Sequence, residues 1–213
     1  MLDTQEIINT IALTRINYFH LTGMLQLYRR LGSATAVIEH RRNIRDVLPD
    51  ASPKLVQSLQ QIDEPLHRAE IELQWDLENG VMPLCMNDEN YPQRLRQCDD
   101  APLMLFYKGN INLNQRRVIC VVGTRRNTVY GEDLIRRFMR ELRQLCPQLL
   151  VISGLAYGVD IIAHRQALQN GYPTVGVLAH GVDYLYPTRH KQTADEMVKK
   201  GGLLTEFLTQ TNA

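Results

Sequence analysis

From Arg117 onward the sequence alternates between short, wholly apolar runs and amphipathic stretches of about 12 to 16 residues. The apolar runs are RVICVVG, QLLVISG, PTVGVLAHG and LLTEF. A strand that is apolar throughout is buried on both faces, and a helix between successive strands is typical of a parallel sheet. The sequence therefore predicts an α/β fold with a Rossmann-like parallel sheet covered by helices on both faces.

Side-chain patterns refine this sheet. Cys120 lies inside the apolar run VICVV, which predicts a small buried hydrophobe. The stretch over 130–146 predicts an amphipathic helix, whose inward residues are Leu134, Ile135, Phe138, Leu142 and Leu145. The four cysteines form no CxxC pair, and no histidine stands at metal-ligand spacing. We therefore expect a reduced protein with no metal and no cofactor.

The first 75 residues have a different texture, because short helical patterns alternate with glycine-centred turns. Gly32 should end one helix and Ser33 should cap the next. We expect a small all-helical domain over 1–75, similar to a SAM or helix-hairpin-helix module. A helical docking domain without a ligand explains the pattern at least as well.

The second expected domain, over 76–213, opens with two more strands, VMPLCM and PLMLFYKGN. After the run LLTEF only LTQTNA remains, so a doubly wound sheet would lack its second half. We therefore expect an extended Rossmann-like domain that is truncated at its C-terminus.

Charge is concentrated rather than high. The net charge is +1, but the segment from Arg116 to Arg143 holds eight arginines and three carboxylates, a local charge of +5. Such a cluster suits phosphate binding, although a solvated helix face explains part of it. A 44% apolar composition without a secretory signal or a membrane-length apolar run favours a folded cytoplasmic protein.

Ligands of parallel sheets bind beyond the carboxyl ends of the strands. In the first such loop, VVGTRRNTVYG, Gly123 permits close approach, Thr124 offers a hydroxyl and an amide, and Arg125 and Arg126 supply charged donors. The loop is neither GxGxxG nor a Walker A motif, so a dinucleotide or ATP site is not expected. Arginines that are merely solvated remain the alternative interpretation.

The next two loops are rich in small, aromatic and basic residues. Ser153 and Gly154 belong to a tight bend that leads into a helix, whose N-terminus favours anions. His164 on that helix is expected to be packed and hydrogen-bonded. The third loop, HGVDYLYPTRHK, ends at Lys191 and interleaves aromatic with basic residues. Such a loop can stack bases and hold phosphates, or be an ordinary surface loop.

Catalytic motifs are absent from the sequence: it holds no GxSxG, no HExxH and no cysteine paired plausibly with a histidine. The carboxylates nearest to the loops, Asp160 and Asp183, have no evident acid or base partner. No reaction suggests itself, and we expect a binding protein rather than an enzyme.

Together the loops resemble the DprA/Smf family. VVGTRRNTVYG resembles its G-[ST]-R-x-x-[ST]-x-Y-G turn, and SGLAYGVDIIAH its SG-x-A-x-G-[IV]-D-x-x-AH block. VLAHGVDYLYPTRH is similar to its G-x-D-x-x-YP segment, GGLLTEF to its last strand, and NYPQRLRQCDDAPLMLFYKGN to its linker. The blocks stand in the family's order from about Tyr91 to Phe207, over half of the chain.

The resemblance implies an extended Rossmann domain that binds single-stranded DNA without catalysis, forms homodimers and interacts with RecA in natural transformation or recombination. Applied to the matching positions of this sequence, the resemblance implies phosphate contacts by Gly123, Thr124 and Arg125. It also implies that Ser153 and Gly154 lie beside those phosphates and that Lys191 extends the path of the DNA. Where Tyr157 stands, many family members have arginine, so a possible stacking ring replaces a cation. The family's later RNR block would lie beyond Ala213.

The same loop set also resembles a wider group of Rossmann-like proteins that bind or cleave nucleotides. This group includes the nucleoside monophosphate phosphoribohydrolases, which usually carry a PGGxGT-type block. The absence of that block up to Ala213 mildly favours DNA binding over nucleotide hydrolysis.

Overall fold

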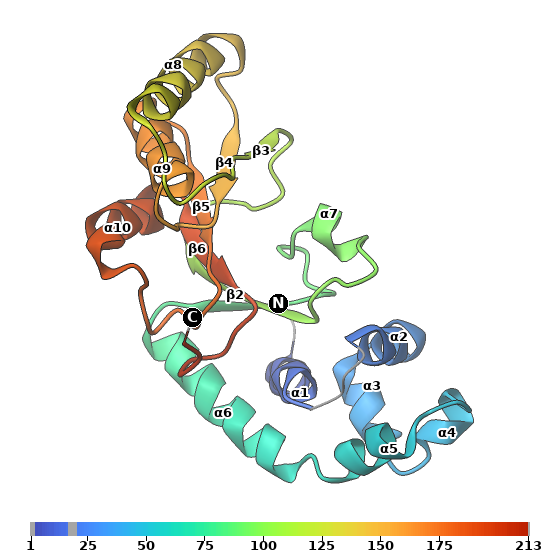
Figure 1. The fold of residues 1–213 in the computed structure, drawn as a ribbon. Coiled ribbons are helices and arrows are strands. Elements are labelled where there is room, and N and C mark those ends of the chain that lie inside the picture. Colours follow the sequence, from blue (N-terminus) through green and yellow to red (C-terminus); the bar gives the residue numbers. More distant parts are fainter. Residues whose placement is uncertain (1–2, 17–20, 213) are drawn as a thin grey trace. The chain divides into compact units, whose positions relative to one another are not determined.

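The computed structural model describes residues 3–16 and 21–212. The chain divides into two compact units, Met1–Leu105 and Phe106–Ala213. Its strands are ordered β1-β2-β6-β5-β4-β3 in one six-stranded sheet (Figure 1). Each unit is described separately below. No helix in the described residues is long and apolar enough to cross a membrane.

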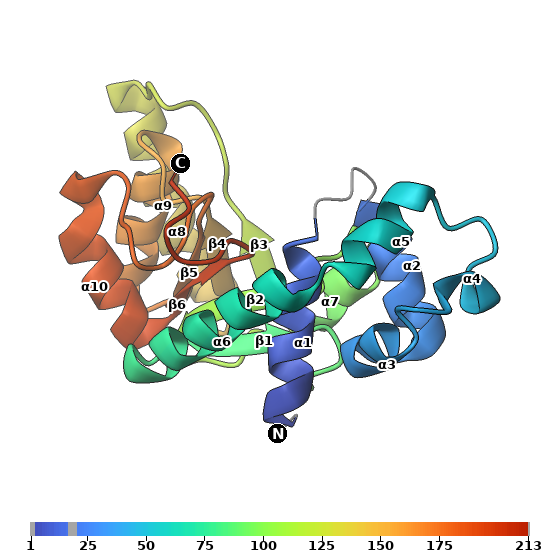
Figure 2. The same ribbon diagram turned by 90° about the horizontal axis from the view of Figure 1, so that it is seen from below.

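Six helices come first in the described part of unit 1. They are α1 (Thr4–Thr14), α2 (Leu21–Leu31), α3 (Ala34–Glu39), α4 (Ile44–Val47), α5 (Pro53–Gln60) and α6 (Asp63–Glu78). Helix α6 packs against α1, and the two helices cross in Figure 2. The predicted turn between α2 and α3 is confirmed, since Gly32 has a φ of +85° and the Ser33 hydroxyl accepts a hydrogen bond from the Ala36 amide at 3.0 Å.

Two short elements follow in the same unit, β1 (Met82–Cys85) and α7 (Gln93–Arg96). Strand β1 contacts both α1 and α6, so the compact unit continues past the helices to Leu105. The boundary expected between residues 75 and 76 falls inside α6. Unit 1 is therefore not all-helical, and a separate domain over 1–75 stays a prediction.

Carboxylates are buried in the interior of unit 1. Glu6 accepts hydrogen bonds from the amides of Ala34 (2.7 Å) and Thr35 (2.9 Å), which begin helix α3. Glu72 is paired with Arg68 at 2.7 Å. Asp76 is fully buried, and neither carboxylate oxygen has a partner in the described residues. Burial, and next the charge of Glu72, raise the pKa of Asp76 to about 8.

The strands of unit 2 form a mixed sheet. Strands β3 (Val118–Cys120), β4 (Leu150–Ser153), β5 (Thr174–Val177) and β6 (Gly202–Thr205) are parallel. Strand β2 (Met104–Gly109) pairs with β6 in the antiparallel sense, with Phe106 opposite Thr205. The strands predicted from Arg117 onward are therefore parallel, as expected. The sheet as a whole is mixed, because β2 is not joined to β6 by a β-α-β crossover that would force parallel pairing.

Three helices cover one face of this sheet. They are α8 (Val129–Leu145), α9 (Val159–Gln169) and α10 (Lys191–Lys200), the last preceded by the 3-10 helix η1 (Thr188–His190). Figure 1 shows α8, α9 and α10 on the same side of the strands. Val151 and Met139 belong to one core cluster beneath α8 and α9, and Leu203 and Met197 to another beneath α10.

The other face is not covered by helices of unit 2 near β3, so the prediction for Cys120 is wrong. Ile119 and Val121 pack against the core cluster of α8 and α9, whereas Cys120 is exposed and Val122 is 74% exposed. Alternate residues of a strand point to opposite faces. Because β3 is the last strand of the sheet, the second face has a neighbouring strand on one side only.

Only part of the apolar face of α8 is buried. Ile135 and Leu142 pack against the core, as predicted. Leu134, Phe138 and Leu145 are exposed instead, Leu145 by 83%. One side of α8 contacts α9, and the side that carries Leu134, Phe138 and Leu145 faces solvent. The periodicity gave the apolar face correctly, but no helix or strand of unit 2 covers its outer half.

Candidate nucleic-acid interface

The loops after β3 and β4 are joined at the carboxyl ends of the strands. The Val159 amide at the start of α9 donates a hydrogen bond to the Thr124 carbonyl at 3.1 Å. A Cβ at Gly158 would lie 2.1 Å from that same carbonyl oxygen, and Gly158 has a φ of +79°. Gly123 in turn packs on the Val159 side chain. Only glycine fits at Gly158, and it fixes the first loop on the second.

The first loop keeps its charged donors free. Its turn is closed by the Thr124 hydroxyl, which accepts a hydrogen bond from the Arg126 amide at 3.1 Å. Thr128 is the N-cap of helix α8, and its hydroxyl accepts a hydrogen bond from the Gly131 amide at 3.1 Å. Arg125 and Arg126 are exposed, and neither guanidinium pairs with another described residue. Two unpaired cations therefore flank a helix N-terminus, which favours an anion there.

The arginines along α8 are held differently. Arg136 lies 3.8 Å from both Glu132 and Asp133, and Arg137 lies 3.2 Å from Asp133. The Arg143 guanidinium donates to the Pro147 carbonyl and lies over the Tyr172 ring. Much of the +5 segment is thus neutralised or engaged, and the unpaired charge is highest at the loop.

A pocket of about 130 Å³ lies where the three loops meet. Tyr157 and Tyr186 line it and are 40% and 50% exposed, so their rings are accessible from solvent. The other lining residues are Arg125, Gly154, Ala156, Ala179, His180 and Pro187. A small cavity with two aromatic rings, apolar walls and one arginine suits a planar, partly apolar group.

Buried histidines support the walls of this pocket. His190 binds the Leu155 carbonyl through Nδ1 at 2.8 Å, and its ring meets Tyr157 edge to face at 5.1 Å. His180 accepts a hydrogen bond from the Tyr186 amide at 3.4 Å. Burial lowers the pKa of His190, so the ring stays neutral near pH 7. These rings position the two tyrosines.

His164 lies deeper, as the sequence predicts. It is fully buried, and its Nδ1 contacts the Thr174 hydroxyl at 2.7 Å. That hydroxyl donates its proton to the Val151 carbonyl, so it accepts from His164. Burial lowers the pKa of His164 to about 3, and its Nε2 has no partner in the described residues. His164 is a neutral packing residue.

The predicted site residues are only partly brought together. Arg125, Gly154 and Tyr157 line the pocket, with Gly123, Thr124 and Arg126 in the adjoining loop. Ser153 is buried, and its hydroxyl donates to the Val121 carbonyl at 2.6 Å, which ties β4 to β3. Lys191 is not in the pocket lining and pairs with Asp195 at 2.9 Å.

Sequence reasoning missed part of the pocket wall. Tyr186, Pro187 and His180 line it, but the third loop had been singled out only for its mixture of aromatic and basic residues. The available signal was Tyr186 directly before Pro187 in a loop that follows a parallel strand, since such loops lie at the ligand-binding edge of the sheet.

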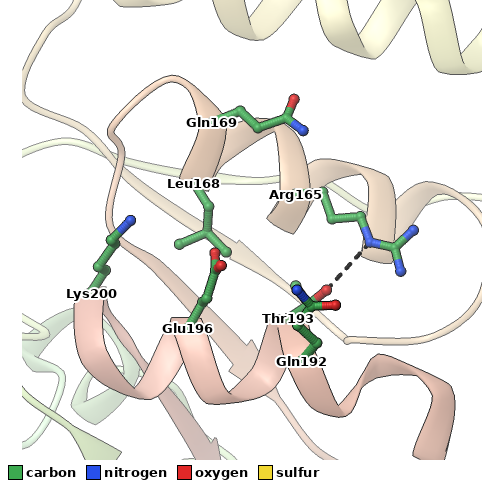
Figure 3. A pocket seen from close by; sticks show the side chains of 7 residues that line it. All are labelled: Arg165, Leu168, Gln169, Gln192, Thr193, Glu196 and Lys200. Atoms are coloured by element: carbon green, nitrogen blue, oxygen red, sulfur yellow. Dashed lines mark hydrogen bonds between the residues drawn. The ribbon is translucent and has the colours of Figure 1, made fainter.

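A second hollow of about 400 Å³ lies between α9 and α10 (Figure 3). Arg165 spans it, and its Nε donates to the Thr193 hydroxyl at 3.3 Å. The remaining lining residues are Leu168, Gln169, Gln192, Glu196 and Lys200. None of the residues predicted for DNA binding belongs to it, and its charges are of both signs.

The parallel strands, the glycine bends and the pocket at their carboxyl ends define a Rossmann-like ligand-binding protein. Residues 82–213 match the family model of the DNA recombination-mediator protein A. This chain belongs to that family, whose curated members carry the names DprA and Smf.

Individual relatives agree with this assignment. The DNA processing protein DprA of Streptococcus pneumoniae is 37% identical over 120 residues, which is 56% of this chain and 42% of the relative. That of Bacillus subtilis is 34% identical over 136 residues, 63% of this chain and 45% of the relative. The chain thus spans less than half of these two proteins.

Two solved structures extend the comparison. The X-ray structure of S. pneumoniae DprA covers all of this chain with a TM-score of 0.75 and 26% identity, and the chain covers 70% of it. DprA from Helicobacter pylori, described as having a unique single-stranded DNA binding mode, has a TM-score of 0.54 and 28% identity. That match covers 62% of this chain and 58% of the H. pylori protein.

Proposed function

We propose that this chain binds single-stranded DNA without catalysing a reaction. The observation that carries the proposal is the pair of unpaired arginines, Arg125 and Arg126, beside a pocket with two accessible tyrosine rings. The H. pylori relative is described as a single-stranded DNA binder, which supports the same ligand class.

Each half of a nucleotide finds a complementary group. A guanidinium grips phosphate oxygens through two parallel hydrogen bonds, and the α8 N-terminus adds a favourable dipole beside them. A base that stacks on an aromatic side chain contributes about 1–3 kcal/mol without sequence readout. Because the bases of a duplex are already stacked and paired, the pocket should favour single strands.

The rest of the proposal follows from family membership. We infer that the whole protein forms homodimers, interacts with RecA in natural transformation or recombination, and acts in the cytoplasm. Light scattering of the whole protein tests the dimer. Co-purification with RecA in the presence and absence of single-stranded DNA tests the partner.

Fluorescence anisotropy with a labelled oligothymidylate tests the central proposal. Affinity should fall steeply with salt, with a slope of about −0.7 for each phosphate neutralised on a single strand. A duplex of equal length should bind more weakly, and a nucleoside monophosphate should be recovered unhydrolysed. Salt-insensitive binding, or tighter binding of the duplex, would refute the proposal.

A further inference from the structure

Helix α9 points its N-terminus toward the pocket, but two of its first-turn amides are already engaged. The Val159 amide donates to the Thr124 carbonyl at 3.1 Å, and the Ile161 amide donates to the Ala156 carbonyl at 3.2 Å. The amides of the first helical turn attract an anion when they have no other partner. An amide that already donates a hydrogen bond no longer contributes. Two first-turn amides of α9 are engaged in this way, and in α8 the Gly131 amide is capped by the Thr128 hydroxyl. The start of α8 is the better anion site because Arg125 and Arg126 precede it, not because its amides are all free.

A buried carboxylate strengthens that conclusion. Asp160 lies in the first turn of α9 and is only 8% exposed. A Cβ built on Gly154 would lie 2.7 Å from its Oδ2 atom, so the carboxylate sits against the glycine that lines the pocket. Within the described part of the chain, no hydrogen bond or ion pair satisfies this carboxylate.

The two ends of the site therefore differ in the charge they accept. Arg125 and Arg126 offer cations on the side of the first loop. The pocket wall that includes Gly154 and Ala156 offers apolar surface and two tyrosine rings, and the Asp160 carboxylate lies behind Gly154, outside the lining. A phosphate at that wall would meet a like charge in a partly desolvated place, where repulsion is strong.

We propose that Asp160 is a selectivity residue, which keeps phosphate away from the α9 N-terminus so that the pocket takes the base of a nucleotide. The inference rests on the proposed binding of single-stranded DNA and assigns the orientation of a bound nucleotide. Its phosphates lie on Arg125 and Arg126, and its base lies between Tyr157 and Tyr186. Asp160 acts through its charge rather than by contact, since it lies behind Gly154 outside the pocket lining, and a base carries no negative charge for it to repel.

The test compares the wild type with Asp160→Asn and Asp195→Asn. The control removes the same charge from an exposed residue of the same unit, which pairs with Lys191 and lies outside the pocket. Inorganic phosphate binding is measured directly by calorimetry. Oligothymidylate is compared with an abasic strand of equal length by anisotropy. Asp160→Ser is a second neutral variant, in case Asp160→Asn does not fold.

The wild type and Asp195→Asn should bind phosphate weakly and prefer the thymidylate strand. A neutral residue at position 160 should raise phosphate affinity about tenfold and reduce the preference for thymidylate several-fold. If folded Asp160 variants match Asp195→Asn in both measurements, the inference is overturned while DNA binding stands. If the wild type binds neither strand, the proposed function fails, and a gain of phosphate binding at position 160 still supports the charge barrier.

Discussion

The two units treat ionisable groups in opposite ways. Among the described residues, the buried ionisable groups of unit 1 include the carboxylates Glu6, Glu72 and Asp76, whereas those of unit 2 include three histidines and Asp160. Unit 1 uses its buried acids for structure, since Glu6 holds the start of α3 and Glu72 holds Arg68. Unit 2 keeps cations at an exposed loop and leaves a single buried acid, Asp160, beside its pocket.

The difference shows what a binding surface requires. A buried charge must be paired or neutralised, so it stabilises a fold and is unavailable to a ligand. An exposed, unpaired guanidinium contributes little to stability but can exchange water for phosphate. The site in unit 2 therefore lies where its charges have been left without internal partners.

The largest expected effect concerns Asp76. Its pKa of about 8 in the folded protein lies above the ordinary 3.8, so the unfolded chain releases this proton first. Its stabilising contribution is complete below pH 4 and is lost as the pH rises toward 8, by up to about 1.4 kcal/mol per pH unit. Denaturant unfolding followed by Trp75, the only tryptophan, measures this loss. Asp76→Asn should flatten the profile, and an unchanged slope would contradict the assignment.

Two glycines give a matched comparison between the units. Gly158 and Gly32 both have positive φ, but a Cβ at Gly158 meets backbone at 2.1 Å, whereas one at Gly32 meets nothing within 4 Å. Gly32→Ala should cost about 1 kcal/mol from backbone strain alone. Gly158→Ala adds a backbone clash, and we expect about 3 kcal/mol or more and impaired DNA binding. Equal losses in denaturant unfolding would mean that the loops are not locked together.

Arg125 should matter more to DNA binding than the arginines on α8. Arg125→Ala is expected to weaken binding about tenfold, because it removes a charge-assisted contact worth about 1.4 kcal/mol or more. Arg136→Ala, Arg140→Ala and Arg143→Ala should each cost only a few-fold, since these side chains lie along the helix away from the pocket. Anisotropy at one fixed salt concentration compares the folded variants. Should a helix variant fail while Arg125→Ala binds normally, the DNA path runs along α8.

The smallest expected effect separates structure from binding at Ser153. Its hydroxyl donates to the Val121 carbonyl, so Ser153→Ala should lower the free energy of unfolding by about 1 kcal/mol. DNA affinity should change less than twofold, because the hydroxyl already has a backbone partner. A variant that keeps its stability but binds DNA several-fold more weakly would support the phosphate contact expected from the sequence.

Local patterns predicted local features well. The Gly32 and Ser33 turn follows from residue chemistry alone, since glycine adopts positive φ and serine caps a helix. The strands and helices after Arg117 follow from periodicity. Arg125 and Gly154 could be predicted in the site because parallel strands bring their carboxyl ends to one edge of a sheet.

Features that depend on neighbours could not be predicted in this way. The antiparallel pairing of β2 is decided by where its partner lies, not by its own sequence. The exposure of Cys120 depends on β3 being the last strand, and that of Phe138 on which elements pack against α8. The closed environment of Ser153 depends on Val121, 32 residues earlier in the chain.

The outer half of α8 has a consequence for handling this chain in solution. Helix α8 exposes an apolar strip, formed by Leu134, Phe138 and Leu145, and also carries arginines. Added salt screens the arginines, but strongly hydrated anions such as sulfate make apolar surfaces adhere more strongly. Salting-out and DNA release therefore overlap in a titration. A chloride titration at low protein concentration separates DNA release from salting-out. In a sulfate titration, aggregation of the protein would be mistaken for DNA that stays bound.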